Sequence, residues 1–447
     1  MNKPVELPAA YRPEELVVDR PQAGEFLVHR RLFTDPALFE LELTHIFEGT
    51  WLYVCHESQI PNPGDFFTTA MGRQPVVFIR GQDRQVRGFI NACAHRGAVL
   101  CRTRKGTAKF LTCPYHGWVY DAAGRNVEIK DRASGGYPPP FEQQSHDLTA
   151  IPQVESYRGF VFASLNADVP ALGEHLAAAR SFVDLLADQS PDGLEVLPGV
   201  SSYRYQGNWK LQCENGLDGY HVDSVHRVYM DMVARRARMG TDKVQAITTP
   251  DLTRLASGHY SLGNGHIVSW TDVPSPQGRP LAFQRDALEA RVGPQRTHWM
   301  LGRIRNMLLY PNVFLMDQTS TQIRVIRPLT VDLTEVTVYC IAPVGESAAA
   351  RERRVRQYED FLGGSGMATP DDLAEFEACQ RGYYGAPGGR ALVNGYDRGL
   401  GRAPVPLNAD AGAIGCEPAA HTLAWLDETH LHHQFRRWRE LLAKAGA

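Results

Sequence analysis

The sequence predicts an α+β protein in which a small all-β module is inserted into a larger mixed domain. Three observations lead to this prediction. The length of 447 residues suits two or three domains. Residues 51–165 form a series of short β-like runs, and helical spacing appears only outside them. With 43% hydrophobic and 22% charged residues, the chain has the composition of a globular protein with a large core.

The expected elements follow in chain order from apolar runs and turn signals. In the all-β module, turn residues separate β-like runs at residues 75–79, 87–90, 117–120 and 159–163. Residues 171–188 have helical spacing, and a β-like run follows at residues 200–205. Weak periodicity leaves residues 227–300 unassigned and favours long connections there. Further strands are predicted at residues 307–315, 321–327 and 335–342, and helices at residues 349–361, 370–381 and 429–442.

Charge and hydropathy exclude several classes of partner. The formal net charge of −3 offers no basic excess for nucleic acid or anionic lipid. The longest apolar runs fall well short of the roughly 20 residues that span a bilayer. The first residues, MNKPVELPAAYRPEEL, lack the pattern of a signal peptide. Eight scattered cysteines are too few for a disulfide scaffold, so we expect a cytoplasmic protein with thiols or metal ligands.

Two segments of the all-β module each contain one cysteine and one histidine. Cys93 and His95 are separated by seventeen residues from the segment that contains Cys113 and His116. Structural zinc fingers usually draw two cysteines from one element and two histidines from another. The mixed pairing instead suits a Rieske [2Fe–2S] centre, in which two cysteines bind one iron and two histidines bind the other. A zinc site, or two buried thiols near surface histidines, is the alternative.

The flanking residues agree with this interpretation, because the two segments read C-x-H-R-G and C-x2-H-G-W-x-Y. Glycines after the histidines allow backbone N–H groups to approach the cluster sulfurs and tune the reduction potential. Positions 98 and 115 are alanine and tyrosine, where respiratory Rieske proteins have a disulfide. The sequence therefore favours a cluster of the lower-potential, oxygenase type.

A second group of possible ligands lies at residues 214–226. His221 and His226 are five residues apart, about 140° around a regular helix, so they can converge only where the helix ends or bulges. Gly216 and Gly219 indicate a backbone that departs from an ideal helix. Asp218 lies three residues before His221, on the same face, where its carboxylate can accept the imidazole proton.

Asp372 is the predicted third ligand, although its own context offers another role. Thr369 as N-cap, Pro370 at the first helical position and Asp372 three residues after the cap would form a capping box. Taken together with His221 and His226, however, a carboxylate completes two histidines and one acid around a ferrous ion. That set leaves positions open for oxygen, as in non-haem iron oxygenases. A one-electron store in the same chain then predicts reductive activation of O2.

Both constellations together resemble the large (α) subunits of Rieske-type aromatic-ring-hydroxylating dioxygenases. The likeness runs from about residue 26 onward and is greatest to the benzoate and anthranilate 1,2-dioxygenase branch. The stretches that carry the likeness are residues 33–36, 45–51, 188–197, 309–312, 316–318 and 356–361.

The resemblance implies a Rieske domain at residues 48–165, inserted into a helix-grip (START-like) catalytic domain with an antiparallel sheet at residues 166–447. Residues 1–47 would pack on the catalytic domain. The implied catalytic residues are Asp218, His221, His226 and Asp372, of which the last three bind Fe(II). The implied cluster ligands are Cys93, His95, Cys113 and His116. Asp218 would also link His221 to the partner subunit's His116, so that electrons cross a subunit interface.

The resemblance further implies a smaller β subunit in an α3β3 assembly, and a flavin and iron–sulfur reductase that passes electrons from NADH. The expected reaction is cis-1,2-dihydroxylation of an aromatic carboxylate by O2, on the way to catechol. Benzoate, toluate, anthranilate, salicylate and 2-halobenzoate all remain open as substrates. A Rieske monooxygenase or demethylase, and an electron carrier or zinc protein without oxygenase activity, are the alternatives.

A buried substrate carboxylate needs a cation or several hydrogen-bond donors, because burying it alone would cost several kcal/mol. Residues 227–300 are expected to line or cover the pocket. The candidates for binding the carboxylate are Arg303, Arg305, Arg324, Arg327, Asn264 and His266.

Overall fold

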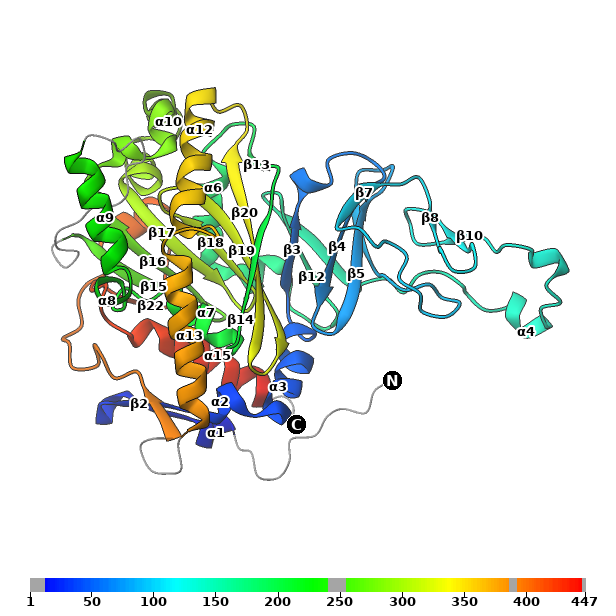
Figure 1. The fold of residues 1–447 in the computed structure, drawn as a ribbon, viewed down its shortest axis with the longest axis horizontal. Coiled ribbons are helices and arrows are strands. Elements are labelled where there is room, and N and C mark those ends of the chain that lie inside the picture. The colour runs from blue at the N-terminus through cyan, green and yellow to red at the C-terminus, as the bar shows by residue number, and fades with distance from the viewer. Residues whose placement is uncertain (1–12, 240–254, 386–391, 444–447) are drawn as a thin grey trace. The chain divides into compact units, whose positions relative to one another are not determined.

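The structure, a computed structural model, describes residues 13–239, 255–385 and 392–443. The chain divides into two compact units, Phe47–Leu172 and a larger unit that combines Met1–Ile46 with Gly173–Ala447. The smaller unit is built mainly from strands, and the larger one combines a broad antiparallel sheet with helices (Figure 1). The predicted α+β class is confirmed.

The smaller unit contains three antiparallel sheets whose strands are short. Their orders are β6-β5-β4-β7, β10-β9-β8 and β11-β12-β3. The strands are β3 (Leu52–His56), β4 (Asp65–Met71), β5 (Gln74–Arg80), β6 (Val86–Ile90), β7 (Lys105–Thr107), β8 (Leu111–Thr112), β9 (Val119–Tyr120), β10 (Asn126–Glu128), β11 (Gln153–Tyr157) and β12 (Phe160–Ser164). One short helix, α4 (Pro139–Glu142), lies in the connection between β10 and β11.

The core of the smaller unit continues into the two segments that contain cysteine and histidine. Val77, Ile79 and Phe89 from the central strands belong to the same buried cluster as Cys93 and Cys113. Each large apolar side chain removed from water contributes roughly 1.5–3 kcal/mol to folding. Both cysteine loops are therefore anchored directly in the hydrophobic core of their own unit.

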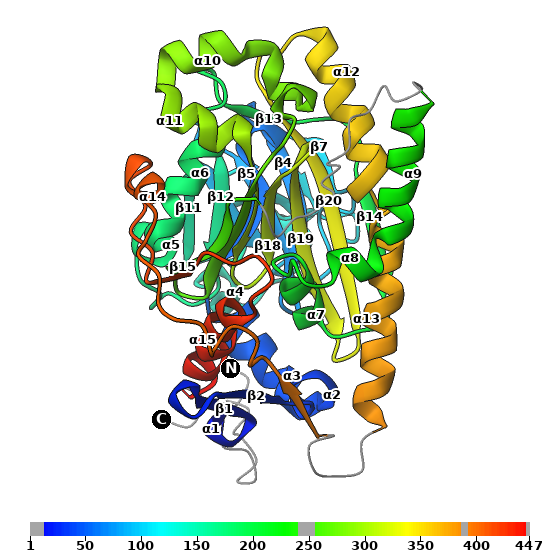
Figure 2. The same cartoon turned by 90° about the vertical axis from the view of Figure 1, so that its left-hand side faces the viewer.

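The larger unit is organised around an antiparallel sheet that has nine strands among the described residues (Figure 2). Its order is β13-β20-β19-β18-β17-β16-β15-β22, and β14 also pairs with β20. The strands are β13 (Leu194–Val196), β14 (Ser201–Tyr205), β15 (Ser257–Gly263), β16 (His266–Asp272), β17 (Arg303–Leu309), β18 (Val313–Asp317), β19 (Thr321–Thr330), β20 (Leu333–Pro343) and β22 (Ala420–Thr422). A separate small sheet joins β1 (Val17–Arg20), β2 (Glu25–His29) and β21 (Val393–Gly395).

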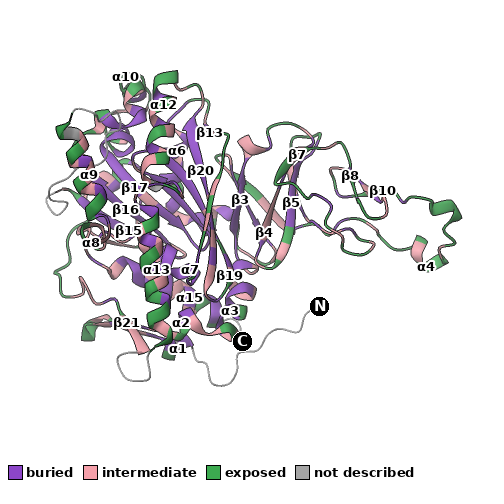
Figure 3. Cartoon of the chain, viewed as in Figure 1, coloured by how far each residue is buried: buried purple, intermediate pink, exposed green. Residues whose placement is uncertain are grey.

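Several helices of the larger unit have one buried face. In α13 (Thr369–Tyr384), the buried residues Thr369, Asp372, Phe376 and Gln380 recur every three or four positions, while its other face is exposed (Figure 3). The other α-helices among the described residues of this unit are α1 (Pro13–Leu16), α2 (Arg31–Thr34), α3 (Pro36–Glu42), α5 (Leu172–Leu176), α6 (Arg180–Ala187), α7 (Trp209–Asn215), α8 (Val222–Val225), α9 (Arg227–Arg238), α10 (Arg285–Val292), α11 (Pro294–Thr297), α12 (Ala348–Gln357), α14 (Ala409–Ala413) and α15 (His432–Ala443). None of the helices in the described part of the chain has both the length and the apolar character to cross a bilayer.

Two of the expected elements need correction. The strand predicted at residues 307–315 is two strands, β17 and β18, because the chain turns at residues 310–312, where Pro311 has no N–H to offer a ladder. The described parts of residues 227–300 are not mainly connections, since they contain α9, α10, β15 and β16, while residues 240–254 lie outside the described residues. Their strands are rich in serine, histidine and glycine, so simple apolar alternation does not reveal them.

Candidate metal centres and substrate pocket

The two cysteine loops of the smaller unit share one backbone pattern. The N–H of Gly97 donates to the carbonyl of Cys93 at 2.8 Å, and the N–H of Gly117 donates to the carbonyl of Cys113 at 3.0 Å. Each cysteine N–H in turn donates to the carbonyl five residues later, at 2.9 and 2.7 Å. Both glycines have positive φ, 69° and 72°, which lets each loop close tightly. Two matching loops thus present one cysteine and one histidine each.

The side chains of these loops fit a two-iron cluster. Cys93 and Cys113 are buried free thiols, and the rings of His95 and His116 lie 4.6 Å apart at their centroids. Within the described residues, Nδ1 of His95 is a buried atom without a hydrogen-bond partner. Two thiolates at one end and two neighbouring imidazoles at the other match the donor set of a Rieske cluster.

Tyr120 adds a contact that the sequence did not predict. Its hydroxyl oxygen accepts the N–H of Ala94 at 3.1 Å and lies 3.2 Å from Sγ of Cys93. Because the oxygen accepts from the backbone, the O–H is available to donate to the sulfur. The tyrosine belongs to the C-x2-H-G-W-x-Y motif, but nothing in that spacing assigns its hydroxyl to a sulfur in the other loop. Trp118 stacks on His95, with 4.9 Å between the ring centroids.

In the larger unit, the two predicted histidine ligands lie at the two ends of a short helix, where the helical backbone is interrupted, as their spacing required. His221 precedes α8, His226 follows it with ψ of 18°, and α9 begins at the next residue. The break brings the two rings to 5.2 Å between centroids. His221 and His226 therefore converge although they are five residues apart.

Asp372 faces both histidines from the first turns of α13. Its Oδ1 lies 3.2 Å from Nε2 of His226 and 3.5 Å from Nε2 of His221. The capping-box alternative is wrong: Ala368 occupies the N-cap position, no side chain caps the helix, and Thr369 is already helical. One residue of shift at the helix start turns Asp372 away from the backbone and toward the histidines.

These three side chains fit a mononuclear metal site. In the part of the chain that the structure describes, they are the one group of three or more possible ligands whose atoms all lie within 4.8 Å of one another. With metal–ligand distances of about 2.0–2.2 Å, one ion can reach all three atoms. Two imidazole nitrogens and one carboxylate oxygen are the donor set of the facial triad that binds ferrous iron.

Asn215, at the end of α7, is a neighbour of the triad that sequence reasoning missed. Its Nδ2 donates to Oδ1 of Asp372 at 3.1 Å and lies 3.2 Å from Nε2 of His221. It lies within the stretch that drew attention to the histidines, three residues before Asp218. No motif distinguishes this asparagine from an ordinary helix-terminal one, so the sequence alone carried no signal for it.

Asp218 holds His221 in one orientation, as predicted. Its Oδ2 lies 3.0 Å from Nδ1 of His221, and its Oδ1 accepts the N–H of Tyr220 at 2.6 Å. Burial lowers the pKa of His221, but the hydrogen bond to Asp218 and the charge of Asp372 outweigh it and leave the pKa raised. With Nδ1–H directed at Asp218, the lone pair on Nε2 of His221 points to His226 and Asp372, the other members of the triad.

A buried ion pair supports the helix that leads into this site. Lys210 on α7 contacts Glu42 on α3 at 2.5 Å, and both side chains are almost completely buried. The indole N–H groups of Trp209 and Trp438 also donate to Glu42, at 2.8 and 2.6 Å. Three side chains from α7 and α15 thus surround one carboxylate on α3 and set the position of α7.

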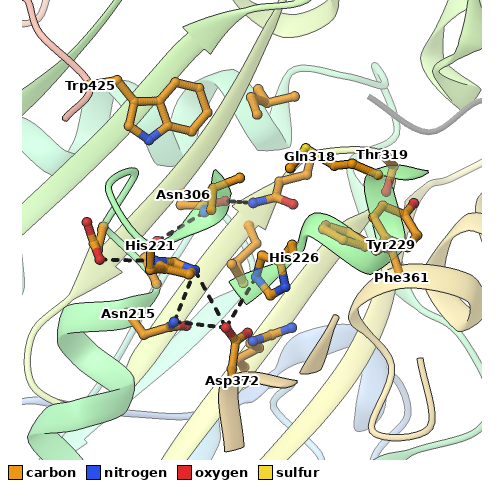
Figure 4. Close-up of a pocket in the computed structure, with 17 residues that line it drawn as sticks. Asn215, His221, His226, Tyr229, Asn306, Gln318, Thr319, Phe361, Asp372 and Trp425 are labelled. Atoms are coloured by element: carbon orange, nitrogen blue, oxygen red, sulfur yellow. Dashed lines mark hydrogen bonds and ion pairs between the residues drawn. The ribbon is translucent and has the colours of Figure 1, made fainter. Parts of the chain in front are cut away.

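A pocket opens over the triad and is lined by apolar and amide side chains (Figure 4). Tyr229 and Met230 from α9 line it, which agrees with the expectation that residues 227–300 contribute. The other lining residues are Asn215, Gly216, Asp218, His221, Val222, His226, Ile304, Asn306, Met316, Gln318, Thr319, Arg324, Phe361, Asp372 and Trp425.

The two glycines near the histidines lie where the backbone leaves the helix, and they also provide space for aromatic neighbours. Gly216 has ordinary helical angles, φ −61° and ψ −16°. A methyl group there would lie 2.4 Å from the ring of Phe314, and one at Gly219 would lie 1.3 Å from Trp425. The helix ends at Gly216, as expected, and close packing against aromatic rings gives both positions a second reason to be glycine.

Of the six candidates for binding a substrate carboxylate, only Arg324 lines the pocket. Arg303 pairs with Asp272 and Asp410, Arg305 pairs with Asp317, and Arg327 is an exposed partner of Glu335. Asn264 and His266 both contact the backbone carbonyl of His175. Arg324 is almost fully buried, with guanidinium contacts to Gln322 at 3.4 Å and Thr369 at 3.5 Å.

One unit has side chains that fit a Rieske cluster and the other has three that fit a ferrous ion, which together indicate an oxygenase of the Rieske type. Comparison with protein families agrees: residues 50–154 match the Rieske [2Fe–2S] domain, and residues 197–444 match the catalytic domain of the ring-hydroxylating alpha subunit. The chain belongs to the family of ring-hydroxylating α subunits. Its members carry a [2Fe–2S] cluster and a mononuclear iron, and a reductase supplies electrons from NADH. The electron-carrier alternative is thereby set aside.

Several individual relatives are similar to this chain over most of its length. The chain is 46% identical to the toluate 1,2-dioxygenase subunit alpha of Pseudomonas putida, with 97% of this chain and 94% of the relative covered. It is 45% identical to the large subunits of 2-halobenzoate 1,2-dioxygenase from Burkholderia cepacia (91% and 90% covered) and anthranilate 1,2-dioxygenase from Acinetobacter baylyi (95% and 91% covered). In fold, it resembles naphthalene 1,2-dioxygenase from Rhodococcus sp., with a TM-score of 0.79 at 24% identity over 93% of this chain and 94% of that one.

Proposed function

We propose that this chain is the α subunit of a dioxygenase that cis-dihydroxylates a benzoate-type aromatic carboxylate at carbons 1 and 2. The observation that carries the proposal is a largely apolar pocket with the triad at one wall and one arginine among its described lining residues. An apolar space accommodates an aromatic ring, and the arginine can pair with the negative charge of a carboxylate. The relatives, which act on toluate, 2-halobenzoate and anthranilate, support the same class of substrate.

We assign the metal ligands residue by residue. The cluster ligands are Cys93, His95, Cys113 and His116, and the iron ligands are His221, His226 and Asp372. When bound, the two centres supply single electrons and oxygen activation. Asp218 keeps Nε2 of His221 available as a ligand, and Asn215 steadies the carboxylate of Asp372 by donating to its Oδ1.

Arg324 is the residue to which we assign the substrate carboxylate. Its side chain is almost fully buried and lines the pocket, so a substrate carboxylate that enters the pocket can pair with its positive charge. A carboxylate can offer a guanidinium two charge-assisted hydrogen bonds. Replacing Arg324 with glutamine should raise KM for benzoates by about tenfold or more, since a charge-assisted hydrogen bond contributes about 1.5–3 kcal/mol. The control is Arg327→Gln on the exposed side of the same strand, for which KM should not change.

For the assembly, we propose an α3β3 complex with a smaller β subunit, served by a flavin and iron–sulfur reductase in the cytoplasm. The relatives are themselves named as alpha or large subunits, which supports a second kind of subunit. Eight free thiols agree with a reducing compartment.

Oxygen uptake with product analysis tests the proposed reaction. The purified complex, a matching reductase and NADH would be given benzoate, toluates, anthranilate and 2-halobenzoates. We expect consumption of one O2 per substrate and either a cis-diol acid or, from anthranilate, catechol. A product with a single added oxygen would replace the dioxygenase by a monooxygenase or demethylase. Absence of oxygen uptake with every aromatic acid would exclude this class of substrate.

We further propose that Asp218 links His221 to the partner subunit's His116 and so carries electrons between subunits. The expected result for Asp218→Ala is that both metal centres stay largely filled while electron transfer stops. Iron analysis would show the filling, and rapid mixing of the reduced enzyme with O2 and substrate would show the block. Coupled turnover at the normal rate in this variant would remove the role.

A further inference from the structure

A chain of amide groups on one wall of the pocket defines what chemistry that wall can offer to a substrate. Asn306 lies on β17, and Gln318 follows directly after the neighbouring strand β18. Nδ2 of Asn306 donates to the backbone carbonyl of Gly216 at 3.0 Å. Nε2 of Gln318 donates to Oδ1 of Asn306 at 2.8 Å. Both amides line the pocket over the triad (Figure 4).

The carbonyl of Gly216 determines the orientation of both amides. The oxygen and nitrogen of a side-chain amide are easily exchanged in assignment, so a contact between two amides alone would not establish a direction. A backbone carbonyl can only accept, however, so Asn306 must turn its NH2 to Gly216. Its oxygen is then left for Gln318, which must turn its own NH2 to Asn306. The amide of Gln318 therefore has its oxygen on the other side.

Oε1 of Gln318 is consequently an acceptor at the pocket wall. Nothing in the described residues donates to it, and Figure 4 shows it on the side of the amide away from Asn306, toward Tyr229. An acceptor next to an apolar space favours a ligand that brings an N–H or O–H group. It disfavours a carboxylate, whose charge suits Arg324. The pocket thus has two chemically distinct polar positions.

We propose that Oε1 of Gln318 accepts a hydrogen bond from an amino or hydroxyl substituent on the ring, which makes an amino- or hydroxybenzoate the preferred substrate. The inference rests on the proposed function and selects within its substrate class. Methyl and halogen substituents cannot donate, so they leave this acceptor unsatisfied in a desolvated pocket. The expected discrimination is about tenfold in kcat/KM, typical of one unmade hydrogen bond to a neutral group.

The test compares substrates on the same enzyme preparation. The complete oxygenase with its reductase would be assayed for kcat/KM with anthranilate, 2-methylbenzoate and benzoate. The wild-type enzyme should prefer anthranilate by about tenfold, and Gln318→Met, which keeps the length but removes the acceptor, should abolish that preference. The ratio of two substrates does not depend on the fraction of folded enzyme. The control is the same change at an exposed position of α11, Gln295→Met, which should keep the wild-type ratio.

Each other outcome contradicts the inference in a different way. Equal kcat/KM for anthranilate and 2-methylbenzoate in the wild-type enzyme would show that no donor is selected. A preference that survives Gln318→Met would place the selecting group elsewhere. An equal loss for all three acids would mean that Gln318 holds the carboxylate through its remaining N–H. Turnover of none of these acids would remove the proposed function and this inference with it, whereas the first three outcomes leave the function intact.

Discussion

The two metal centres of this chain are built in opposite ways. The cluster loops lie within 24 residues of sequence, repeat one backbone pattern and are anchored in the core of the smaller unit. The triad draws two histidines from the ends of α8 and its carboxylate from α13, about 150 residues later. Its geometry also depends on Asn215, Asp218 and the buried pair below α7. Local sequence therefore specifies the first centre, whereas long-range packing of the larger unit specifies the second.

This difference predicts that each centre can be emptied without the other. Asp372→Ala should reduce the iron content from about three to about two per chain and abolish product formation, while the electron paramagnetic resonance signal of the reduced cluster remains. Cys113→Ser should remove that signal and leave the triad of the larger unit able to bind one iron. Asp371→Ala, one residue away on the same helix, is the control and should keep about three irons per chain. Loss of both centres in either variant would show that they depend on each other.

A change in the support of α7 should affect only the larger unit's centre. Glu42→Gln leaves the ammonium of Lys210 buried without its counter-charge, which should lower the free energy of unfolding by about 3–5 kcal/mol. Urea titration followed by iron content and cluster absorbance would then show release of the mononuclear iron at a lower urea concentration than loss of the cluster. The exposed neighbour Glu40→Gln should change stability by less than about 0.5 kcal/mol. Simultaneous loss of both signals would contradict the separate behaviour of the two centres.

The same difference explains what could be predicted from the sequence. The cluster ligands follow from spacing, because the loops close through contacts between residues at most five apart. The histidine pair and Asp218 were also visible, since helical geometry limits which neighbours share a face. Asp372 was ambiguous because a helix start invites a capping role, and one residue of shift decides between the two. Asn215 and Gln318 could not be predicted: their partners come from other elements, and only the folded chain brings them together.

Glu214, on α7 next to the buried pair, should make the stability of the larger unit depend on pH. Burial raises the pKa of Glu214 from 4.5 to about 8, although the hydroxyl of Tyr396 and the charge of Lys210 lower it. The folded form keeps its proton between those two values while the unfolded form loses it. The free energy of unfolding therefore falls as pH rises through this window, by up to about 1.4 kcal/mol per pH unit, and is unaffected by this group below pH 4.5.

Glu214→Gln removes this titration, so the stability difference between the variant and the wild-type protein should grow in the variant's favour as pH rises. Urea denaturation at about pH 5.5, 6.5 and 7.5 would measure the difference. A constant difference over that range would show that Glu214 is ionised in the folded protein. The cluster absorbance of the smaller unit should follow the same pH course in both proteins.

The smallest effect is expected at the cluster, where a single tyrosine hydroxyl changes only the reduction potential. Tyr120→Phe removes the O–H that is available to Sγ of Cys93 and keeps the ring in its buried place. A hydrogen bond to a cluster sulfur stabilises the reduced, more negative state, so its loss should lower the reduction potential without loss of iron. Redox titration followed by electron paramagnetic resonance would measure the shift. Tyr115→Phe is the matched control, because that side chain is in the other loop and is 59% exposed. The cluster of this variant should have the reduction potential of the wild-type protein. An unchanged potential in Tyr120→Phe would mean that the sulfur receives no hydrogen bond from this hydroxyl.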